Sequence, residues 1–118
     1  MTDQLTTKRC IPCEGGIPPL NDAEIKKLMP QVPGWSVTMT KQKSRDVQAL
    51  TKEFTFNNFR AAMAFLRQVE ELAESEGHHP DFSVHYNRVV FIIWTHAIRG
   101  LHENDFILAA KIDQLITG

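Results

Sequence analysis

The sequence predicts a single α+β domain with the element order α-β-β-α-β-β-α, in which a four-stranded antiparallel sheet carries three helices on one face. Helical and alternating strand patterns follow one another along the chain in that order. The 118 residues are enough for one hydrophobic core, and the 42% hydrophobic and 23% charged residues are typical of a globular chain. The domain is expected over residues 21–118, after an irregular N-terminal arm over residues 1–20.

The charge balance and the hydropathy argue against two classes of partner. Thirteen Lys and Arg against fourteen Asp and Glu give a formal net charge of -1. That balance supplies no broad basic field for direct nucleic-acid binding. No apolar run approaches the roughly 20 residues of a membrane span, and the first residues lack the pattern of a signal peptide. The protein is therefore expected to be cytoplasmic and free of the membrane.

The first half of the domain predicts a helix and a hairpin. Asn21, with an acid three residues later, has the pattern of a capping box and predicts a short helix that ends near Met29. Residues 35–40 and 47–56 alternate apolar and polar side chains and predict two strands. The charged residues 41–46 are expected to join them as a longer hairpin loop.

The clearest helix of the sequence is expected between Asn57, as its N-cap, and Gly77, as its left-handed C-terminal residue. Apolar residues step by three and four through it, which predicts one buried face. This face consists of Phe59, Ala62, Met63, Leu66, Val69 and Ala73.

Residues 82–86 and 89–96 predict a second strand pair with Asn87-Arg88 as a two-residue turn. In that register Val84 faces Phe91, and one apolar face is expected to lie under the helices. It consists of Phe82, Val84, Tyr86, Val89, Phe91 and Ile93.

Extending the same register places His79 opposite His96, beside Trp94, with Pro80 disturbing regular pairing. Cross-strand partners have Cβ atoms about 5 Å apart, so two imidazoles could address one small molecule. A histidine cluster is therefore expected at one end of the helix-free face of the sheet.

A last helix is expected from Glu103 to Ile116. Its apolar residues form a stripe that is wider than one packing face needs. The stripe consists of Phe106, Ala109, Ile112 and Ile116, widened by Ile107, Leu108, Ala110 and Leu115. Such a stripe could serve self-association or a protein partner.

Both cysteines fall in one segment, Cys10-Ile11-Pro12-Cys13. In a cytoplasmic chain they are expected to be reduced, and one Cys-x-x-Cys supplies only half of a zinc site. The flanks predict irregular chain rather than the strand and helix around a thioredoxin-type pair. A structural or incidental role is favoured, with redox or metal chemistry as the alternative.

Each histidine also has a structural interpretation. A helix C-terminus favours imidazolium at His78 and His79, and His96 could hydrogen-bond to neighbouring backbone. His85 is expected to be solvated on its strand, and His102 to be structural before the last helix. Three histidines could ligate zinc, but no acid or cysteine at a familiar spacing reinforces that interpretation, so no metal is predicted.

A spaced pattern in the second half of the chain resembles the signature of the pterin-4a-carbinolamine dehydratases, also called 4a-hydroxytetrahydrobiopterin dehydratases. It consists of Glu74-Ser75-Glu76-Gly77-His78-His79-Pro80, followed by Tyr86, Thr95-His96 and Asp105. The similarity extends from about Leu20 to the C-terminus. The arm, with Glu14-Gly15-Gly16, is similar to the N-terminal extension of bacterial members.

The resemblance implies the same α+β fold and a hydro-lyase reaction. Members remove water from the 4a-hydroxytetrahydropterin left by aromatic amino acid hydroxylases, as in phenylalanine hydroxylation. The product is quinonoid dihydropterin, and the reaction is a step of tetrahydrobiopterin recycling. Loss of water needs one proton delivered to the C4a hydroxyl and one taken from N5, and histidine, with an ordinary pKa of about 6.5, can do either. No cofactor is required, and the family forms homodimers or homotetramers.

The family's functional residues carry over to five positions, His78, His79, His96, Glu74 and Thr95, and Trp94 is added to them as a hypothesis of its own. His78, His79 and His96 are the implied catalytic residues, with His78 and His96 as the acid/base pair and His79 chiefly binding substrate. The predicted substrate-binding residues are His79, Trp94, Thr95 and Glu74. Asp105 is expected to be structural, in the first turn of the last helix.

Departures from the animal members concern Gly77, Trp94 and Ala97. They suggest a rearranged pterin pocket in which Trp94 is a wall or stacking surface, or else fills a subunit contact.

Two other functions remain open. The first is a regulatory protein-binding module, like a transcriptional coactivator, that acts through the last helix. The second is a domain that binds pterins without turnover.

Overall fold

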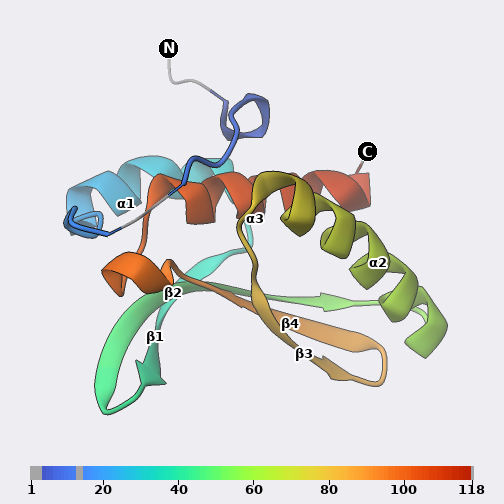
Figure 1. The fold of residues 1–118 in the computed structure, drawn as a ribbon. Coiled ribbons are helices and arrows are strands. Elements are labelled where there is room, and N and C mark those ends of the chain that lie inside the picture. Colours follow the sequence, from blue (N-terminus) through green and yellow to red (C-terminus); the bar gives the residue numbers. More distant parts are fainter. Residues whose placement is uncertain (1–3, 13–14, 118) are drawn as a thin grey trace.

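The computed structural model describes residues 4–12 and 15–117 (Figure 1). Its helices are α1 (Asp22–Leu28), α2 (Phe59–Glu76) and α3 (Glu103–Thr117). Its strands are β1 (Ser36–Gln42), β2 (Arg45–Thr55), β3 (Asp81–His85) and β4 (Arg88–Ile93). Three short 3-10 turns are η1 (Leu5–Thr7), η2 (Met29–Gln31) and η3 (His96–Ile98). The predicted order α-β-β-α-β-β-α is confirmed.

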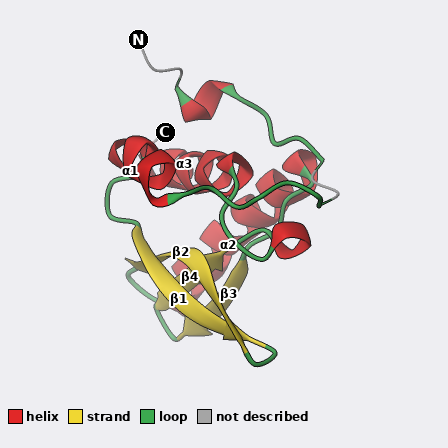
Figure 2. Cartoon of the chain, turned by 90° about the vertical axis from the view of Figure 1, so that its left-hand side faces the viewer, coloured by secondary structure: helices red, strands yellow, loops and turns green. Residues whose placement is uncertain are grey.

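The four strands form one antiparallel sheet in the order β1-β2-β4-β3, and the helices form a layer on one of its faces (Figure 2). β2 and β4 are the central strands, and their helix-facing residues Leu50, Phe54, Phe91 and Ile93 are buried. Phe65 of α2 packs on this surface, with its ring centroid 5.3 Å from that of Phe54. The predicted fold class is therefore confirmed.

The start of α1 follows the predicted capping box. The Asn21 side chain accepts a hydrogen bond from the Glu24 backbone N–H, and the Glu24 carboxylate accepts one from the Asn21 N–H, both at 2.9 Å. The two bonds satisfy backbone donors that a helix start leaves free.

The hairpin between β1 and β2 is tighter than predicted. The strands continue to Gln42 and Arg45, which leaves only Lys43 and Ser44 in the turn, instead of the longer loop expected over residues 41–46. Their φ values are 53° and 49°. A two-residue hairpin turn of this kind usually contains Asn and Gly, so Lys-Ser gave no signal for it.

The N-cap of α2 is Asn58, not Asn57: the Asn58 side chain accepts a hydrogen bond from the Ala61 N–H at 2.8 Å. The chain stays extended one residue further than predicted because Asn87 holds the backbone N–H and C=O of Phe56. Gly77 ends the helix in the left-handed conformation, as predicted.

The buried face of α2 is also rotated from the predicted one. Phe65, which the predicted face omitted, is buried, whereas Phe59 and Met63 are 50% and 38% exposed. The reason is aromatic packing, because the Phe65 ring contacts those of Phe54, Phe56 and Phe91.

The hairpin between β3 and β4 turns at Tyr86-Asn87, so that His85 pairs with Arg88 and Phe82 with Phe91. The predicted register was therefore wrong by two residues, although a shift of two leaves each side chain on its predicted face. Phe82 and Tyr86 were expected under the helices but are 47% and 65% exposed. Phe82 lies on the edge strand β3, and Tyr86 lies in the turn beyond it with φ 57°.

The wide apolar stripe of α3 is covered by the chain itself. Residues 106–110 and Ile112 are at most 5% exposed, and η1 packs against this helix with Leu5 buried in the same core. The stripe therefore needs no second molecule to cover it, contrary to the docking role considered for it. Ile116, 48% exposed, is the exception.

Among the described residues, no helix is both long and apolar enough to cross a membrane.

Of the two cysteines, Cys10 is a half-buried free thiol. Cys13 lies outside the described residues, so the interpretation of the cysteine pair stays a prediction.

Candidate active site

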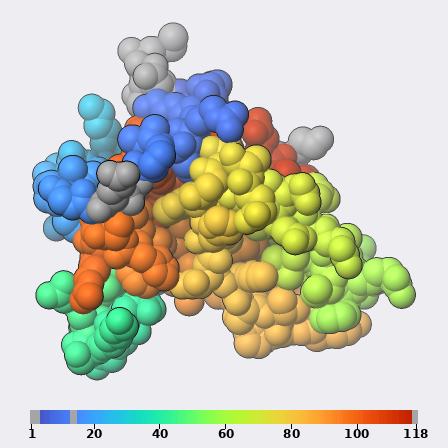
Figure 3. All heavy atoms as spheres, viewed as in Figure 1, coloured from blue at the N-terminus to red at the C-terminus, as the bar shows by residue number. Residues whose placement is uncertain are grey.

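A cleft of about 430 Å³ lies where the end of α2, the segment entering β3, η3 and the N-terminal arm meet. In Figure 3 the blue arm, the yellow end of α2 and the orange η3 segment come together on the face shown. Five predicted site residues line the cleft, namely His78, His79, Trp94, Thr95 and His96. The sixth, Glu74, lies beside them in a neighbouring groove.

The position of His78 follows from the end of α2. Gly77 has φ 66° and turns the chain out of the helix, while the His78 N–H still bonds to the Ala73 carbonyl. A left-handed residue at this place is readily supplied by glycine. The His78 ring is thereby directed toward α3, where its Nε2 lies 2.6 Å from Oδ1 of Asp105.

Asp105 is fully buried and accepts three hydrogen bonds. Besides the ring of His78, its donors are the Thr95 hydroxyl at 2.8 Å and the His102 backbone N–H at 2.9 Å. Because an ionised carboxylate only accepts hydrogen bonds, Nε2 of His78 carries a proton and Nδ1 is left for the cleft. Asp105 is thus more than a helix-terminal charge: it fixes the ring and the tautomer of His78.

His102 is structural, as predicted, and the contact shows how. Its Nδ1 accepts a hydrogen bond from the Asn104 N–H at 2.9 Å, so the imidazole caps the N-terminus of α3. Asp105 bonds back to the His102 N–H, so the two side chains together make a variant of the capping box in which the histidine ring accepts from Asn104 instead of Asp105. The same carboxylate therefore starts the helix and holds His78.

His79 lines both the cleft and the neighbouring groove, and it pairs with an exposed acid. Its Nε2 is 2.6 Å from Oε2 of Glu74, and the two side chains are 60% and 71% exposed. Water competes with such a contact, so the pair leaves His79 free to change partners.

His96 lies on Trp94. The two rings stack with centroids 3.8 Å apart and planes 11° from parallel. Trp94 is itself buried on the helix-free face against Val47 and Ala49, and its Nε1–H bonds to Asp81 at 3.3 Å. Trp94 therefore acts as a rigid platform that sets the plane of the exposed His96 ring.

The predicted cross-strand pair of His79 and His96 does not occur. The two paired strands end at Asp81 and Ile93, before either histidine, so the register argument does not reach them. They share the cleft because of the Gly77 turn and the η3 turn instead. His85 is exposed on its strand, as predicted, with Ser83 as its partner.

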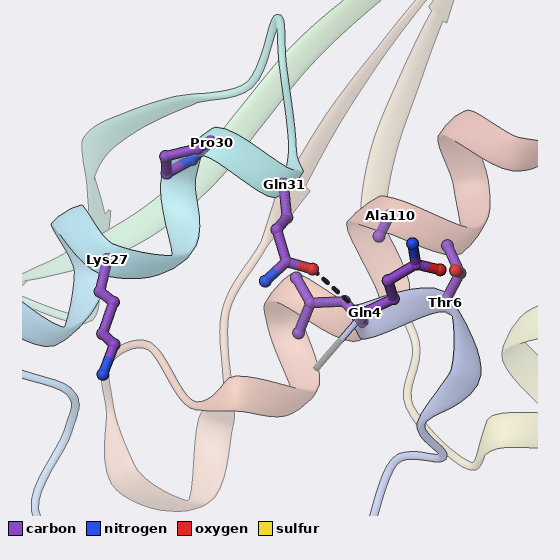
Figure 4. A pocket seen from close by; sticks show the side chains of 7 residues that line it. Gln4, Thr6, Lys27, Pro30, Gln31 and Ala110 are labelled. Atoms are coloured by element: carbon purple, nitrogen blue, oxygen red, sulfur yellow. Dashed lines mark hydrogen bonds between the residues drawn. The ribbon is translucent and has the colours of Figure 1, made fainter. Parts of the chain in front are cut away.

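The titratable side chains that line the cleft are His78, His79, His96 and Asp81. Within residues 4–12 and 15–117, no cluster of three or more His, Cys, Asp or Glu side chains is arranged to hold a metal ion. A larger hollow of about 570 Å³, between η1 and η2, is lined by Gln4, Lys27, Gln31 and other residues without a histidine (Figure 4).

The arm is fixed to the end of α2 through Glu76. This carboxylate accepts the Cys10 backbone N–H at 2.8 Å and Nζ of Lys111 at 2.5 Å. Burial by itself would raise the pKa of Glu76, but the hydrogen bonds from Lys111 and from Cys10 lower it overall. Burial, and then the nearby Glu76 carboxylate, raise the pKa of the Cys10 thiol to about 12.

Comparisons with known proteins give the family. The profile of the family described as pterin 4 alpha carbinolamine dehydratase matches residues 18–115. The chain belongs to this family. A protein of Methylococcus capsulatus, provisionally named pterin-4-alpha-carbinolamine dehydratase, is 48% identical over 94% of this chain and 92% of its own length.

Two further comparisons agree with this family. A Rubrobacter xylanophilus protein with the same provisional name is 44% identical over 95% of this chain and 98% of its own length. A crystal structure described as a transcriptional coactivator/pterin dehydratase from Brucella melitensis is 31% identical, with a TM-score of 0.69. The match covers 82% of this chain and 97% of that one. The resemblance noted in the sequence is thus confirmed at the level of the family.

Proposed function

We propose that this pterin-4a-carbinolamine dehydratase family member is a hydro-lyase that converts 4a-hydroxytetrahydropterin to quinonoid dihydropterin by histidine acid/base catalysis. The observation that carries the proposal is the cleft with His78, His79 and His96, in which a buried carboxylate sets the orientation of His78. An imidazole side chain is able to accept and return a proton near neutral pH. Family membership supplies the substrate class.

The reaction breaks the bond between C4a and its hydroxyl oxygen. One proton adds to that oxygen, which leaves as water, and another leaves N5. The electron pair of the N5–H bond forms the new double bond between N5 and C4a. Nothing is oxidised or reduced overall, so one acid and one base suffice.

His78 and His96 take these two roles in the proposal. The Asp105 carboxylate at 2.6 Å stabilises the positive charge that His78 acquires when Nδ1 takes up a proton. His96 presents its exposed ring from the Trp94 platform to the same cleft. Two groups on different elements can thus serve different atoms of one substrate.

His79 and Glu74 are proposed to bind rather than to move protons. Their exposed pair can open to admit a polar edge of the substrate at little cost. Thr95 contributes through Asp105, because its hydroxyl is already engaged with that carboxylate at 2.8 Å. Next to Thr95, the contact with the substrate is then made by Trp94, which lines the cleft beside His96.

In the cell, the proposed role is recycling of the tetrahydropterin cofactor for an aromatic amino acid hydroxylase in the cytoplasm. We also propose a homodimer or homotetramer. Phe82 on the edge strand β3, Tyr86 in the turn that follows it, and Phe59 and Met63 of α2 supply the exposed apolar surface for self-association.

A regulatory binding function is the second candidate, favoured by the description of the Brucella structure as a coactivator as well as a dehydratase. The buried stripe of α3 argues against that helix as its docking surface. Such a partner would bind equally well to a His96→Ala variant, whereas pterin turnover would not survive the substitution.

The test is the dehydration rate of freshly made 4a-hydroxytetrahydropterin, followed by absorbance with EDTA present. We expect acceleration by the wild type and at least about a hundredfold loss in His96→Ala. His85→Ala is the matched control, because His85 is an exposed histidine outside the cleft, and we expect it to stay active. A folded wild-type protein that gives no acceleration over buffer would refute the enzyme proposal.

A further inference from the structure

The N-terminal arm reaches into the cleft of the three histidines. Ile11 and Pro12 line it together with His78 and His96. Both residues precede the segment 18–115 that matches the family profile. The Ile11 side chain is 60% exposed, which leaves most of a large apolar group uncovered at the rim of a cleft. Apolar surface in such a place is suited to a ligand with a flat, weakly polar face.

Asn104 holds Ile11 by its backbone. The Asn104 amide donates through Nδ2 to the Ile11 carbonyl at 2.6 Å and accepts through Oδ1 from the Ile11 N–H at 3.0 Å. Only 2% of Asn104 is exposed. The N–H and C=O groups of this buried amide are both hydrogen-bonded to the backbone of Ile11. Separating the two residues is costly, because these groups would be left without partners in a place that water does not reach. Ile11 is therefore fixed although its side chain is exposed.

The arm is held on both sides of this clamp. On one side the Cys10 N–H bonds to Glu76, which is paired with Lys111. On the other side Gly15 passes so close to η3 that a Cβ atom there would lie 3.2 Å from the Ala97 carbonyl oxygen. Gly15 has φ 91°, which favours glycine as well. The arm thus packs against both elements that carry the catalytic histidines.

We infer that Ile11 and Pro12 form an apolar wall of the dehydratase site, against which the bound pterin packs, and that Asn104 is the positioning residue that holds this wall. The inference rests on the proposed function for the nature of the ligand. The wall carries no group that moves a proton, so it contributes to substrate binding and not to the proton transfers.

The first test separates KM from kcat. Ile11→Ala removes an exposed side chain and leaves the fold intact, and we expect KM to rise about fivefold with kcat within about twofold of the wild type. Asn104→Ala releases the whole wall and is expected to raise KM further. Circular dichroism establishes that this variant is folded.

Gln31→Ala is the matched control. Gln31 also bonds to the arm through its side-chain amide, because its Oε1 accepts the Leu5 N–H at 2.9 Å (Figure 4). This bond lies at the hollow between η1 and η2, not at the cleft. We expect KM to be unchanged in this variant.

A second readout does not depend on turnover. In a Cys13→Ser background, alkylation by iodoacetamide at about pH 8 reports how well Cys10 is shielded. The half-buried Cys10 thiol has its pKa raised to about 12, so it should react slowly. We expect Asn104→Ala to speed its alkylation at least about tenfold. Saturating 7,8-dihydrobiopterin should slow alkylation in the same background with Asn104 intact, since a pterin packed on the wall holds the arm in place.

The outcomes separate this inference from the proposed function. Normal turnover with unchanged KM in both Ile11→Ala and Asn104→Ala would overturn the wall and leave the enzyme proposal standing. Absence of turnover in the wild type would refute the enzyme proposal alone. In that case protection of Cys10 by 7,8-dihydrobiopterin would still support the wall, and lack of protection would overturn it.

Discussion

Two histidine–carboxylate pairs lie at the candidate active site, and they have the same length but different surroundings. The distance from Nε2 to the carboxylate oxygen is 2.6 Å both in His78–Asp105 and in His79–Glu74. The first pair is 14% and 0% exposed, and the second is 60% and 71% exposed. Distance alone therefore does not tell what a contact does.

Burial decides the role of each pair. Asp105 is held by the Thr95 hydroxyl and the His102 N–H independently of His78, so it offers a fixed acceptor in a site with little water. Glu74 lies on an exposed helical turn, where solvent screens its charge and its side chain keeps its freedom. The buried pair sets a tautomer, whereas the exposed pair is the one to which we assign an adjustable binding role in the proposed function.

The largest effect is expected from Asp105→Asn. The amide is close in size to the carboxylate, but it can present an N–H to His78. It therefore no longer selects the tautomer of His78 that has a free Nδ1. We expect kcat to fall about 100- to 1000-fold, with a changed pH profile of kcat, while the chain stays folded. Steady-state dehydration over a range of pH measures both effects.

His102→Asn is the control for this variant. Asn is a good N-cap, so the start of α3 and the backbone N–H that bonds to Asp105 should be kept. We expect activity near that of the wild type. An equal loss of kcat in both variants would mean that Asp105 matters through the helix start and not through His78.

Local signals were sufficient to predict much of the fold. The capping box at Asn21 and the left-handed Gly77 were predicted because each depends on residues only a few positions apart. The short turn between β1 and β2 and the register of the hairpin between β3 and β4 were not, because Lys43, Ser44 and Tyr86 take positive φ values that such residues rarely adopt. None of these three residues is a glycine or an asparagine, so the sequence contains no signal for a positive φ at these positions.

The histidine cluster was predicted in the right neighbourhood for an incorrect geometric reason. Strand register placed His79 opposite His96, yet the turns at Gly77 and η3 bring them to one cleft. The bond between His78 and Asp105 joins residues 27 positions apart on two packed elements. Spacing alone does not reveal such a contact, although the place of Asp105 in the family pattern was the available signal.

A second buried pair, Lys111 and Glu76, shows what burial does without a histidine. Lys111 and Glu76 are 15% and 5% exposed. Lys111→Met should leave a buried carboxylate without its cation, and we expect a loss of about 2–3 kcal/mol in the free energy of unfolding at pH 7. Urea denaturation measures this change.

The pH dependence of that loss has a defined sign. Because the pKa of Glu76 is lowered in the folded protein, its stabilisation is present above the ordinary carboxyl pKa and disappears as the pH falls through the lowered value. The difference between the wild type and Lys111→Met should therefore shrink at acidic pH. Arg88→Met is the matched control: it breaks the pair with Glu53, which is 49% and 47% exposed, and should change stability by less than about 0.5 kcal/mol.

The smallest effect is expected from Glu74→Gln, which removes the charge of the exposed pair. KM should change by less than about twofold and kcat not at all, and added salt should bring the wild type close to the variant, because screening already weakens an exposed pair. His79→Gln, which removes the ring itself, should raise KM more, and so separates the histidine from its partner. A fall in kcat for Glu74→Gln as large as that for Asp105→Asn would show that an exposed carboxylate can orient a catalytic histidine as firmly as a buried one. Burial would then no longer explain why two contacts of equal length, one residue apart in the sequence, have different roles.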